Sequence, residues 1–193
     1  MQCTFSGCEE KATFHLSWIE NRRCAKEQHL CAEHTRVTLT QYPPPAPEFS
    51  EKRHRLDGAR QFEIFLVIIS EINEQQVVHL READGSRRIP ILIGLFEAMS
   101  LARRLKGESY PRPLTHDAIA AAIRLLGGEV QDVVIDRLER HCYFANVRIW
   151  VQGDLRLLDV RPSDGFILAI LFGCPIFFTD QVLDKIDQKG SIE

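Results

Sequence analysis

Residues 62–188 consist almost entirely of short strand-like and helix-like segments separated by turn residues. Residues 62–82 carry two runs rich in β-branched and aromatic side chains, and Asp84-Gly85 predicts a hairpin turn after them. The strand that follows contains Pro90, which cannot donate to a sheet ladder, so we expect that strand at an edge or at a bulge. Much of this region therefore has to form a sheet.

Segments with helical periodicity lie between the strand-like runs. Apolar residues recur at helical spacing in 95–107 and again in 115–128, and the segment 163–173 is apolar on every side, which predicts a buried helix. Two strands with hairpin character lie between the second and third helices. Strands in runs with helices between them favour an α+β fold, with a mixed or antiparallel sheet and packed helices, over a regular βαβ alternation.

The first 34 residues hold four of the six cysteines. Cys3 and Cys8 are spaced C-x4-C, Cys31 and His34 are spaced C-x2-H, and the intervening residues read as strand, tight turn and strand. Two ligand pairs brought together by a hairpin describe a zinc ribbon, and three thiolates with one imidazole complete a tetrahedral structural site. We therefore expect residues 1–36 to form a zinc-ribbon-like module that depends on the metal for its stability.

Other residues leave the ligand set open at this point. Cys24 could replace one of the four ligands, and His29 lies two residues before Cys31. His15 and His29 fall within the expected strands, where an ordinary hydrogen-bonded histidine is more common than a ligand. The N-terminal residues also resemble the zinc-binding region of bacterial protein-arginine kinase activator proteins, on Cys3, Cys8, "ATFHLSWI", "HLC" and the C-x2-[CH] ending. This resemblance implies a module for protein binding or oligomerisation, and hence a homo-oligomer.

Residues 37–61 lose periodicity and contain "YPPPAPEFSEKRHRLDG", which is proline-rich and then charged. Such composition is typical of a semi-rigid linker. We therefore expect three parts: the module at 1–36, the linker at 37–61, and the main domain at 62–188. Because that linker gives little reason for extensive packing across it, we expect the main domain to fold without the module.

Composition excludes few functions. With 45% hydrophobic residues, 26% charged residues and a net charge of −3, the chain has no global basic character for binding nucleic acid. The N-terminus lacks the features of a signal peptide, and the longest apolar run, "GFILAILFG", is shorter than a membrane span. We expect a cytoplasmic protein with reduced thiols and no membrane association.

Two helix starts in the main domain repeat one pattern. Both "RPLTHD" (112–117) and "RPSD" (161–164) place Arg-Pro before a hydroxyl residue and then a carboxylate. Thr115 and Ser163 would be good N-caps, and acids in the first turn suit the helix dipole. Capping does not explain the arginines, nor Asp159, which shares with Leu155 and Leu157 a strand face that we expect to point to the core. Helix N-termini with arginines suit phosphate, so a functional rim and simple caps are equally good interpretations.

These residues also lie in stretches that resemble the bifunctional nuclease (BFN) domain family: "VVHLREADGSRRIPILIGLFEA", "RPLTHD", "LDVRPSDGFILA" and "PIFFTDQVL", in the family's order. The resemblance covers about residues 63–186 and implies an α+β domain that cleaves DNA and RNA. The motif positions that it carries over are Glu97, Arg112, His116, Asp117, Asp159, Arg161, Ser163 and Asp164. Val160 and Gly165 depart from the family, which usually has alanine at both positions.

Two hypotheses about function follow. In the first, the protein is a metal-dependent nuclease in which carboxylates among Glu97, Asp117, Asp159 and Asp164 hold Mg²⁺ or Mn²⁺. His116 would then serve as general base or position the water, and Arg112 and Arg161 would hold the phosphate. In the second, the protein is a non-catalytic regulatory or adaptor protein that binds a partner through the zinc ribbon.

Overall fold

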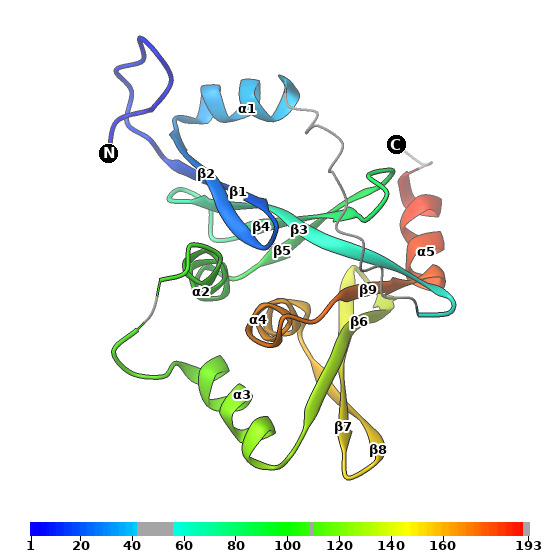
Figure 1. The fold of residues 1–193 in the computed structure, drawn as a ribbon. Helices are drawn as coiled ribbons and strands as arrows, with labels where there is room; N and C mark the ends of the chain where they lie inside the picture. The colour runs from blue at the N-terminus through cyan, green and yellow to red at the C-terminus, as the bar shows by residue number, and fades with distance from the viewer. Residues whose placement is uncertain (42–55, 109, 191–193) are drawn as a thin grey trace. The chain divides into compact units, whose positions relative to one another are not determined.

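The structure is a computed structural model that describes residues 1–41, 56–108 and 110–190. These residues form nine strands and five helices in a mixed α+β arrangement, which confirms the predicted fold class (Figure 1). They divide into two compact units. Unit 1 comprises the described residues 1–41 and 64–108, and unit 2 comprises 56–63 and 110–190. None of the helices in the described segments is long and apolar enough to span a membrane.

Unit 1 is a sheet with two helices, in the strand order β2-β1-β3-β4-β5. Its elements are β1 (Phe14–Glu20), β2 (Arg23–Leu30), α1 (Ala32–Gln41), β3 (Ala59–Ser70), β4 (Gln76–Glu82), β5 (Arg88–Ile93) and α2 (Leu95–Leu105). Gly85, at φ +80°, lies in the predicted turn between β4 and β5. Among the described strands β5 pairs with β4 alone, so Pro90 lies on an edge strand as expected.

The N-terminal hairpin belongs to the same sheet as the strands of the expected main domain. β1 pairs with β3 from Phe14 opposite Ser70 to Trp18 opposite Leu66. Apolar side chains from both segments form one buried cluster, and they are Cys3, Leu16, Trp18, Leu30, Cys31, Phe65, Leu66 and Ile68. Apolar burial on this scale stabilises a domain by several kcal/mol, at about 1.5–3 kcal/mol per large side chain.

The expected boundaries at 36 and 61 therefore do not coincide with those of the structure. Helix α1 continues to Gln41, and β3 begins at Ala59, so both ends of the predicted linker are regular structure. Its central part, 42–55, lies outside the described residues. Composition located the prolines and charges, but the pairing of β1 with β3 is a long-range contact that composition does not reveal.

Unit 2 consists of a second set of strands with three helices. Its elements are α3 (Thr115–Leu125), β6 (Glu129–Glu139), β7 (Cys142–Val151), β8 (Asp154–Val160), α4 (Pro162–Phe172), β9 (Ile176–Thr179) and α5 (Asp180–Gly190). The first residues of β3 pair with β9, β9 runs parallel to β6, and β7 and β8 continue the sheet. Phe62 of β3 meets Phe178 of β9 with ring centroids 4.6 Å apart.

Helix α4 lies at the centre of unit 2, as its uniformly apolar sequence predicted. Phe166, Ile167 and Leu168 are fully buried, and the helix contacts β6 and β7. It ends at Gly173, whose φ of +68° is the left-handed conformation that glycine adopts most readily. A side chain at Gly165 would place its Cβ 2.9 Å from Cγ1 of Val133. The small residue therefore permits the close approach of α4 to β6.

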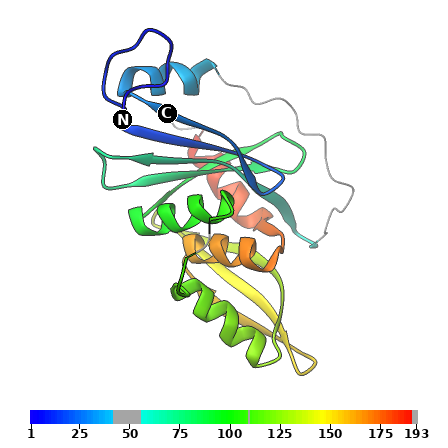
Figure 2. The same ribbon diagram turned by 60° about the vertical axis from the view of Figure 1, so that its left-hand side comes forward.

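Helices α3 and α4 lie side by side and run in the same direction (Figure 2). Near their N-termini His116 of α3 contacts Asp164 of α4. Near their C-termini the Arg124 guanidinium donates to the Leu171 carbonyl at 3.1 Å and lies 4.5 Å from the Phe172 ring centroid. These contacts at both ends hold the two helix N-termini next to each other, so the positive ends of the two helix dipoles are neighbours.

Candidate functional sites

The predicted zinc ligands come together in unit 1. The ligand atoms of Cys3, Cys8, Cys31 and His34 all lie within 4.8 Å of one another. Nδ1 of His34 is 3.2 Å from Sγ of Cys31 and 3.6 Å from Sγ of Cys3. Tetrahedral zinc has bonds of about 2.3 Å to sulfur and 2.0–2.1 Å to nitrogen, so this spacing and this donor set fit the ion.

Local structure explains why these four residues meet. Cys31 directly precedes α1 and His34 lies in its first turn, which brings the C-x2-H pair onto one side of the helix start. Cys3 and Cys8 lie on the N-terminal loop, where the Cys3 amide donates to the Glu10 carbonyl at 2.9 Å and Gly7 has a φ of +80°. The sequence pattern located both pairs, although it did not predict α1.

The electrostatic environment favours one thiolate within the cluster. Burial raises the pKa of Cys3, but hydrogen bonds from the backbone at Cys31 and Phe5, and from the side chains of Cys8 and His34, lower it to about 7. At Cys8 a hydrogen bond from the backbone of Glu10 lowers the pKa, yet burial and the neighbouring thiols leave it raised. A cation at this position would favour deprotonation of both thiols.

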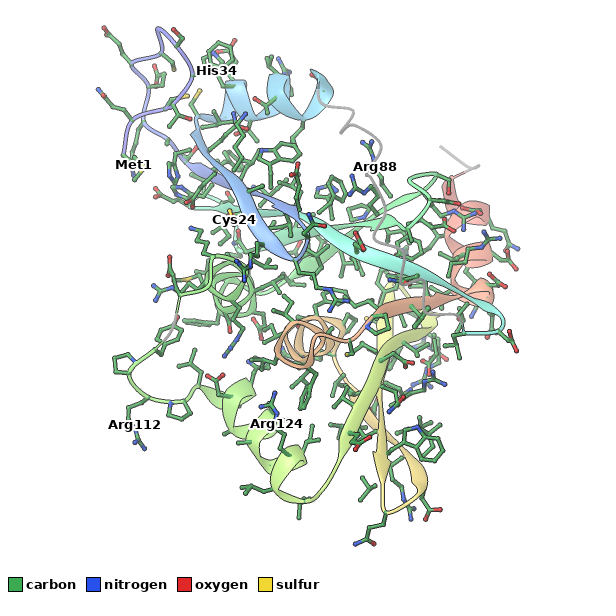
Figure 3. All side chains as sticks on the ribbon, in the orientation of Figure 1. Met1, Cys24, His34, Arg88, Arg112 and Arg124 are labelled. Atoms are coloured by element: carbon green, nitrogen blue, oxygen red, sulfur yellow. The ribbon has the colours of Figure 1, made fainter. Side chains whose placement is uncertain are left out.

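The structure decides between the ligand sets that the sequence left open. Cys24 lies on β2, and its thiol donates to the Lys26 carbonyl at 3.6 Å. Figure 3 shows Cys24 well separated from His34. His29 also lies on β2, and its ring faces His15 instead of the cysteines. Neither residue belongs to the four-ligand cluster.

Three of the predicted site residues come together in unit 2. Nε2 of His116 lies 3.0 Å from Oδ1 of Asp164. The Arg161 guanidinium donates to the same carboxylate through Nε at 2.9 Å and Nη2 at 3.1 Å. His116 and Asp164 are partly buried, with 14% and 21% of their side chains exposed, whereas 66% of the Arg161 side chain is exposed. We call these three residues the His116–Asp164–Arg161 cluster.

Asp164 is anionic over the ordinary pH range. Burial raises the pKa of this carboxyl, but the hydrogen bonds from Arg161 and His116, and their positive charge, outweigh that effect and place the pKa below its usual 3.8. Asp164 is also the third residue of α4, next to unpaired helix amides. The carboxylate therefore fixes the imidazole and the guanidinium with respect to each other.

The predicted N-caps are wrong. The N-cap of α3 is Leu114 and that of α4 is Arg161, so Thr115 and Ser163 are the first and second helical residues. Neither N-cap residue makes a side-chain capping hydrogen bond. The residue that caps α3 is Asp117, whose carboxylate accepts the Leu114 amide at 2.9 Å. Because proline prefers the first helical position, Pro162 begins α4 and moves Ser163 one residue inward, where its side chain is buried.

Asp159 and Arg112 are both exposed to solvent. Asp159 is opposite Asn146 in the β8–β7 ladder and is exposed. The expectation that its strand face points to the core is wrong, because Leu155 and Leu157 on that face are 42% and 63% exposed. Arg112 is exposed on the segment before α3, and Figure 3 shows its side chain pointing outward from the chain.

Glu97 belongs to unit 1, whereas the other seven predicted site residues belong to unit 2. It lies in the first turn of α2, and its carboxylate folds back over Gly94, the N-cap of that helix. An acid in this position interacts favourably with the helix dipole. In the structure Glu97 therefore lies at the start of its own helix, in a different unit from the other predicted site residues.

The carboxylates of the expected metal site do not gather into a group of three or more ligands in the described residues. Among them, the cysteine–histidine cluster is the one group in which three or more potential ligand atoms converge. Asp117 is turned back to its own helix start, and Asp164 is engaged by histidine and arginine. The donor set around α3 and α4 therefore does not fit a divalent cation held by three protein carboxylates.

Comparison with known proteins gives a family match that extends over parts of both units. The model of the bifunctional nuclease domain matches residues 78–190, which is more than half of the chain. Two proteins of Mycobacterium tuberculosis are similar over 115 residues at 36% identity: the uncharacterized protein Rv1829 of strain H37Rv and the uncharacterized protein MT1877 of strain CDC 1551. In each case the match covers 60% of this chain and 68% of the relative. The chain belongs to the bifunctional nuclease domain family.

Proposed function

We propose that the protein is a nuclease that hydrolyses phosphodiester bonds of DNA, RNA or both at the N-termini of α3 and α4. The observation that carries this proposal is the His116–Asp164–Arg161 cluster, in which a base, an orienting carboxylate and a cation meet at two helix starts. Family membership supports the reaction class. The arrangement has the residue types that phosphodiester hydrolysis requires.

His116 is the proposed general base. Because Asp164 is a carboxylate acceptor, neutral His116 carries its proton on Nε2, and Nδ1 keeps a lone pair. Nδ1 takes a proton from a water molecule as the water oxygen attacks phosphorus and the bond from phosphorus to the leaving oxygen breaks. The leaving oxygen gains a proton from solvent or from the imidazolium. Asp164 stabilises that imidazolium and fixes the ring orientation.

Arg161 and the two helix N-termini are the proposed anion-binding groups. Arg161 donates to Asp164 through Nε and Nη2, and most of its side chain remains exposed to an incoming phosphate. Backbone amides at a helix N-terminus bind phosphate oxygens and carry partial positive charge. Charge that develops on the phosphoryl oxygens would thus meet an arginine and two helix dipoles.

The test is a cleavage assay with single-stranded and double-stranded DNA and with RNA, each with and without Mg²⁺ or Mn²⁺. We expect His116→Ala and Asp164→Asn to lower the cleavage rate at least 100-fold, because each removes the oriented base. His141→Ala, which changes an exposed histidine in the β6–β7 turn, is the matched control and should cleave normally. Wild-type activity in His116→Ala, in all metal conditions, would exclude this site.

We further propose that the cysteine–histidine cluster binds one structural zinc ion. Its support is the convergence of three thiols and an imidazole in the described residues. Zinc measured on purified protein should be about one equivalent per chain, and Cys31→Ser should lower it below half of that value. Cys24→Ser is the control and should retain the metal. A zinc content that is the same in Cys31→Ser and Cys24→Ser would refute the proposed ligand set.

A non-catalytic adaptor role is the second candidate, and one observation favours it. The Phe5 ring stacks on His34 with centroids 4.0 Å apart, and the residue is 44% exposed. An exposed aromatic ring held by a metal ligand suits a protein contact, including one with a second copy of this chain. Sedimentation of the wild type and of Phe5→Ala tests this role. An unchanged oligomeric state in Phe5→Ala, together with nuclease activity of the wild type, would count against it.

A further inference from the structure

Two histidines of unit 1 face each other outside both sites described above. His15 of β1 and His29 of β2 are directly opposite in the antiparallel ladder. Their Nδ1 atoms lie 2.7 Å apart, and the two rings meet edge to face with centroids separated by 5.0 Å. Both side chains are partly buried. Two nitrogen ligands are therefore held on neighbouring strands of a sheet, where their backbone positions are fixed.

The neighbouring carboxylate orients one of the rings. Nε2 of His15 lies 3.2 Å from Oε1 of Glu71, whose other oxygen is 3.1 Å from Nζ of Lys11. With its proton on Nε2, neutral His15 presents a lone pair at Nδ1. A histidine that donates its distant N–H to a carboxylate is the usual arrangement around a protein-bound metal ion, because that hydrogen bond fixes the tautomer and raises the basicity of the ligating nitrogen.

We propose that His15 and His29 form a second metal site, which binds a divalent ion such as Ni²⁺ or Cu²⁺ through their Nδ1 atoms. Without the ion the two nitrogens share one proton. The ion replaces that proton, which moves to Nε2 of His29. Imidazole nitrogen is a preferred ligand of both metals.

The distance between the two Nδ1 atoms can be compared with the ligand spacing around a metal ion. With bonds of about 2.0–2.1 Å, two nitrogens in adjacent positions of a square-planar or octahedral ion lie about 2.9 Å apart. In a tetrahedral ion they would lie about 3.3 Å apart. The observed 2.7 Å is closer to the first value. The spacing is therefore compatible with two adjacent ligand positions of Ni²⁺ or Cu²⁺, while the cysteine–histidine cluster suits zinc.

The surroundings leave room for the remaining ligands. His15 also lines a cavity of about 660 Å³, with Ile69 and Met99 among its apolar walls. Water or a small ligand in this cavity can approach the His15 side chain. The nearby charges balance, because Glu71 pairs with Lys11 and Glu27 pairs with Lys106. The two lysines weaken the attraction for a cation, so selectivity has to come from the two nitrogens.

The experiment is a calorimetric titration of the zinc-loaded full-length protein with Ni²⁺, with the zinc content measured before and after. We expect one equivalent of Ni²⁺ to bind while zinc is retained, and this binding to be lost in His15→Gln and in His29→Gln. His141→Gln is the matched control and should bind like the wild type. Glu71→Gln, which changes an exposed side chain and leaves the fold intact, should weaken Ni²⁺ binding 10- to 100-fold, because it removes the orienting carboxylate.

Cu²⁺ provides a second readout that does not depend on affinity. Its electron paramagnetic resonance spectrum should show coupling to two nitrogen nuclei in the wild type and to fewer in either histidine variant. Failure of the wild type to bind Ni²⁺, or binding that persists in His15→Gln or His29→Gln, would overturn the proposal and leave an ordinary hydrogen bond between two rings. Displacement of zinc by Ni²⁺ in place of a second bound ion would also overturn it.

Discussion

At the scale of single residues, Asp117 makes the capping interaction that was expected of Thr115. Capping was assigned to the hydroxyl of Thr115, but the helix begins one residue earlier and the Asp117 carboxylate accepts the Leu114 amide. Both residues lie beside His116, so a change in cleavage at either could be mistaken for catalysis. Stability measurements separate the two effects.

We predict that Asp117→Ala lowers the free energy of unfolding by about 1 kcal/mol, because a capping interaction is lost. Thr115→Ala should change it by less than about 0.5 kcal/mol, since Thr115 is exposed and makes no cap. Urea denaturation of both variants measures the difference. Asp117→Asn keeps an acceptor oxygen and should cleave normally. Loss of cleavage in Asp117→Asn with unchanged stability would give Asp117 a chemical role instead.

His79 makes stability depend on pH in a defined direction. Burial lowers the pKa of His79 below 6.5, and the positive charge of Arg88 adds to this effect. The unfolded chain then binds the proton more readily than the folded chain, so stability is full above about pH 6.5 and falls as the pH falls toward the folded pKa. We predict that His79→Gln reduces this loss between pH 6.5 and 5, as measured by urea denaturation at each pH. His141→Gln, at an exposed position, should leave the slope unchanged.

At the scale of elements, the contact between α4 and β6 depends on the absence of a side chain at Gly165. A Cβ at Gly165 would lie 2.9 Å from Cγ1 of Val133, which is too close, and 3.5 Å from Cγ2 of Val160, which is an ordinary contact. Val133 on β6 therefore leaves no room for a side chain at position 165.

We predict that Gly165→Ala lowers stability by about 1 kcal/mol, although alanine favours a helix more than glycine does. The valine at 133 is β-branched and buried, so it cannot turn aside without strain. Thermal unfolding measures the effect. In a double-mutant cycle, Val133→Ala should reduce the cost of Gly165→Ala, whereas Val151→Ala, at a distant position of β7, should not. A Gly165→Ala protein more stable than the wild type would show that the helix shifts freely.

At the scale of the whole molecule, the N-terminal hairpin is a structural part of unit 1. Leu16, Trp18 and Leu30 bury their side chains in the same cluster as Phe65 and Leu66. The hairpin also pairs β1 with the C-terminal part of β3, from Leu66 to Ser70. Its removal would expose both an apolar surface and an unpaired strand edge.

We therefore predict that a truncated protein consisting of residues 56–193 loses its cooperative thermal transition or aggregates, contrary to the expectation drawn from the linker composition. Removing the proposed zinc ion with a chelator should act in the same direction but less strongly, because the hairpin remains attached. Hydrogen exchange should then increase first in β1, β2 and α1 and later in β6 and β7. A truncated protein that melts cooperatively near the wild-type temperature would show that unit 1 does not need the hairpin.

The sequence by itself determined most elements of the described residues, α1 being an exception, and the chemistry available to them. Periodicity, glycines and turn residues located the strands and helices, because these signals act over a few residues. The spacing of the cysteine and histidine pairs predicted the four residues of the proposed zinc site. The two Arg-Pro helix starts marked His116, Arg161 and Asp164 as candidate site residues. The match to the family's motifs extended over long stretches of unit 1 and unit 2.

Only the tertiary structure decided which of these residues meet. The β1–β2 ladder contains a bulge between Trp18 and Ile19, and without that one-residue shift His15 would face Gln28 instead of His29. Likewise, the contact of His116 with Asp164 requires α3 and α4 to run side by side, and the place of the hairpin requires β1 to pair with β3. Such pairings depend on which arrangement buries the most apolar surface across distant segments, a quantity that no local pattern contains.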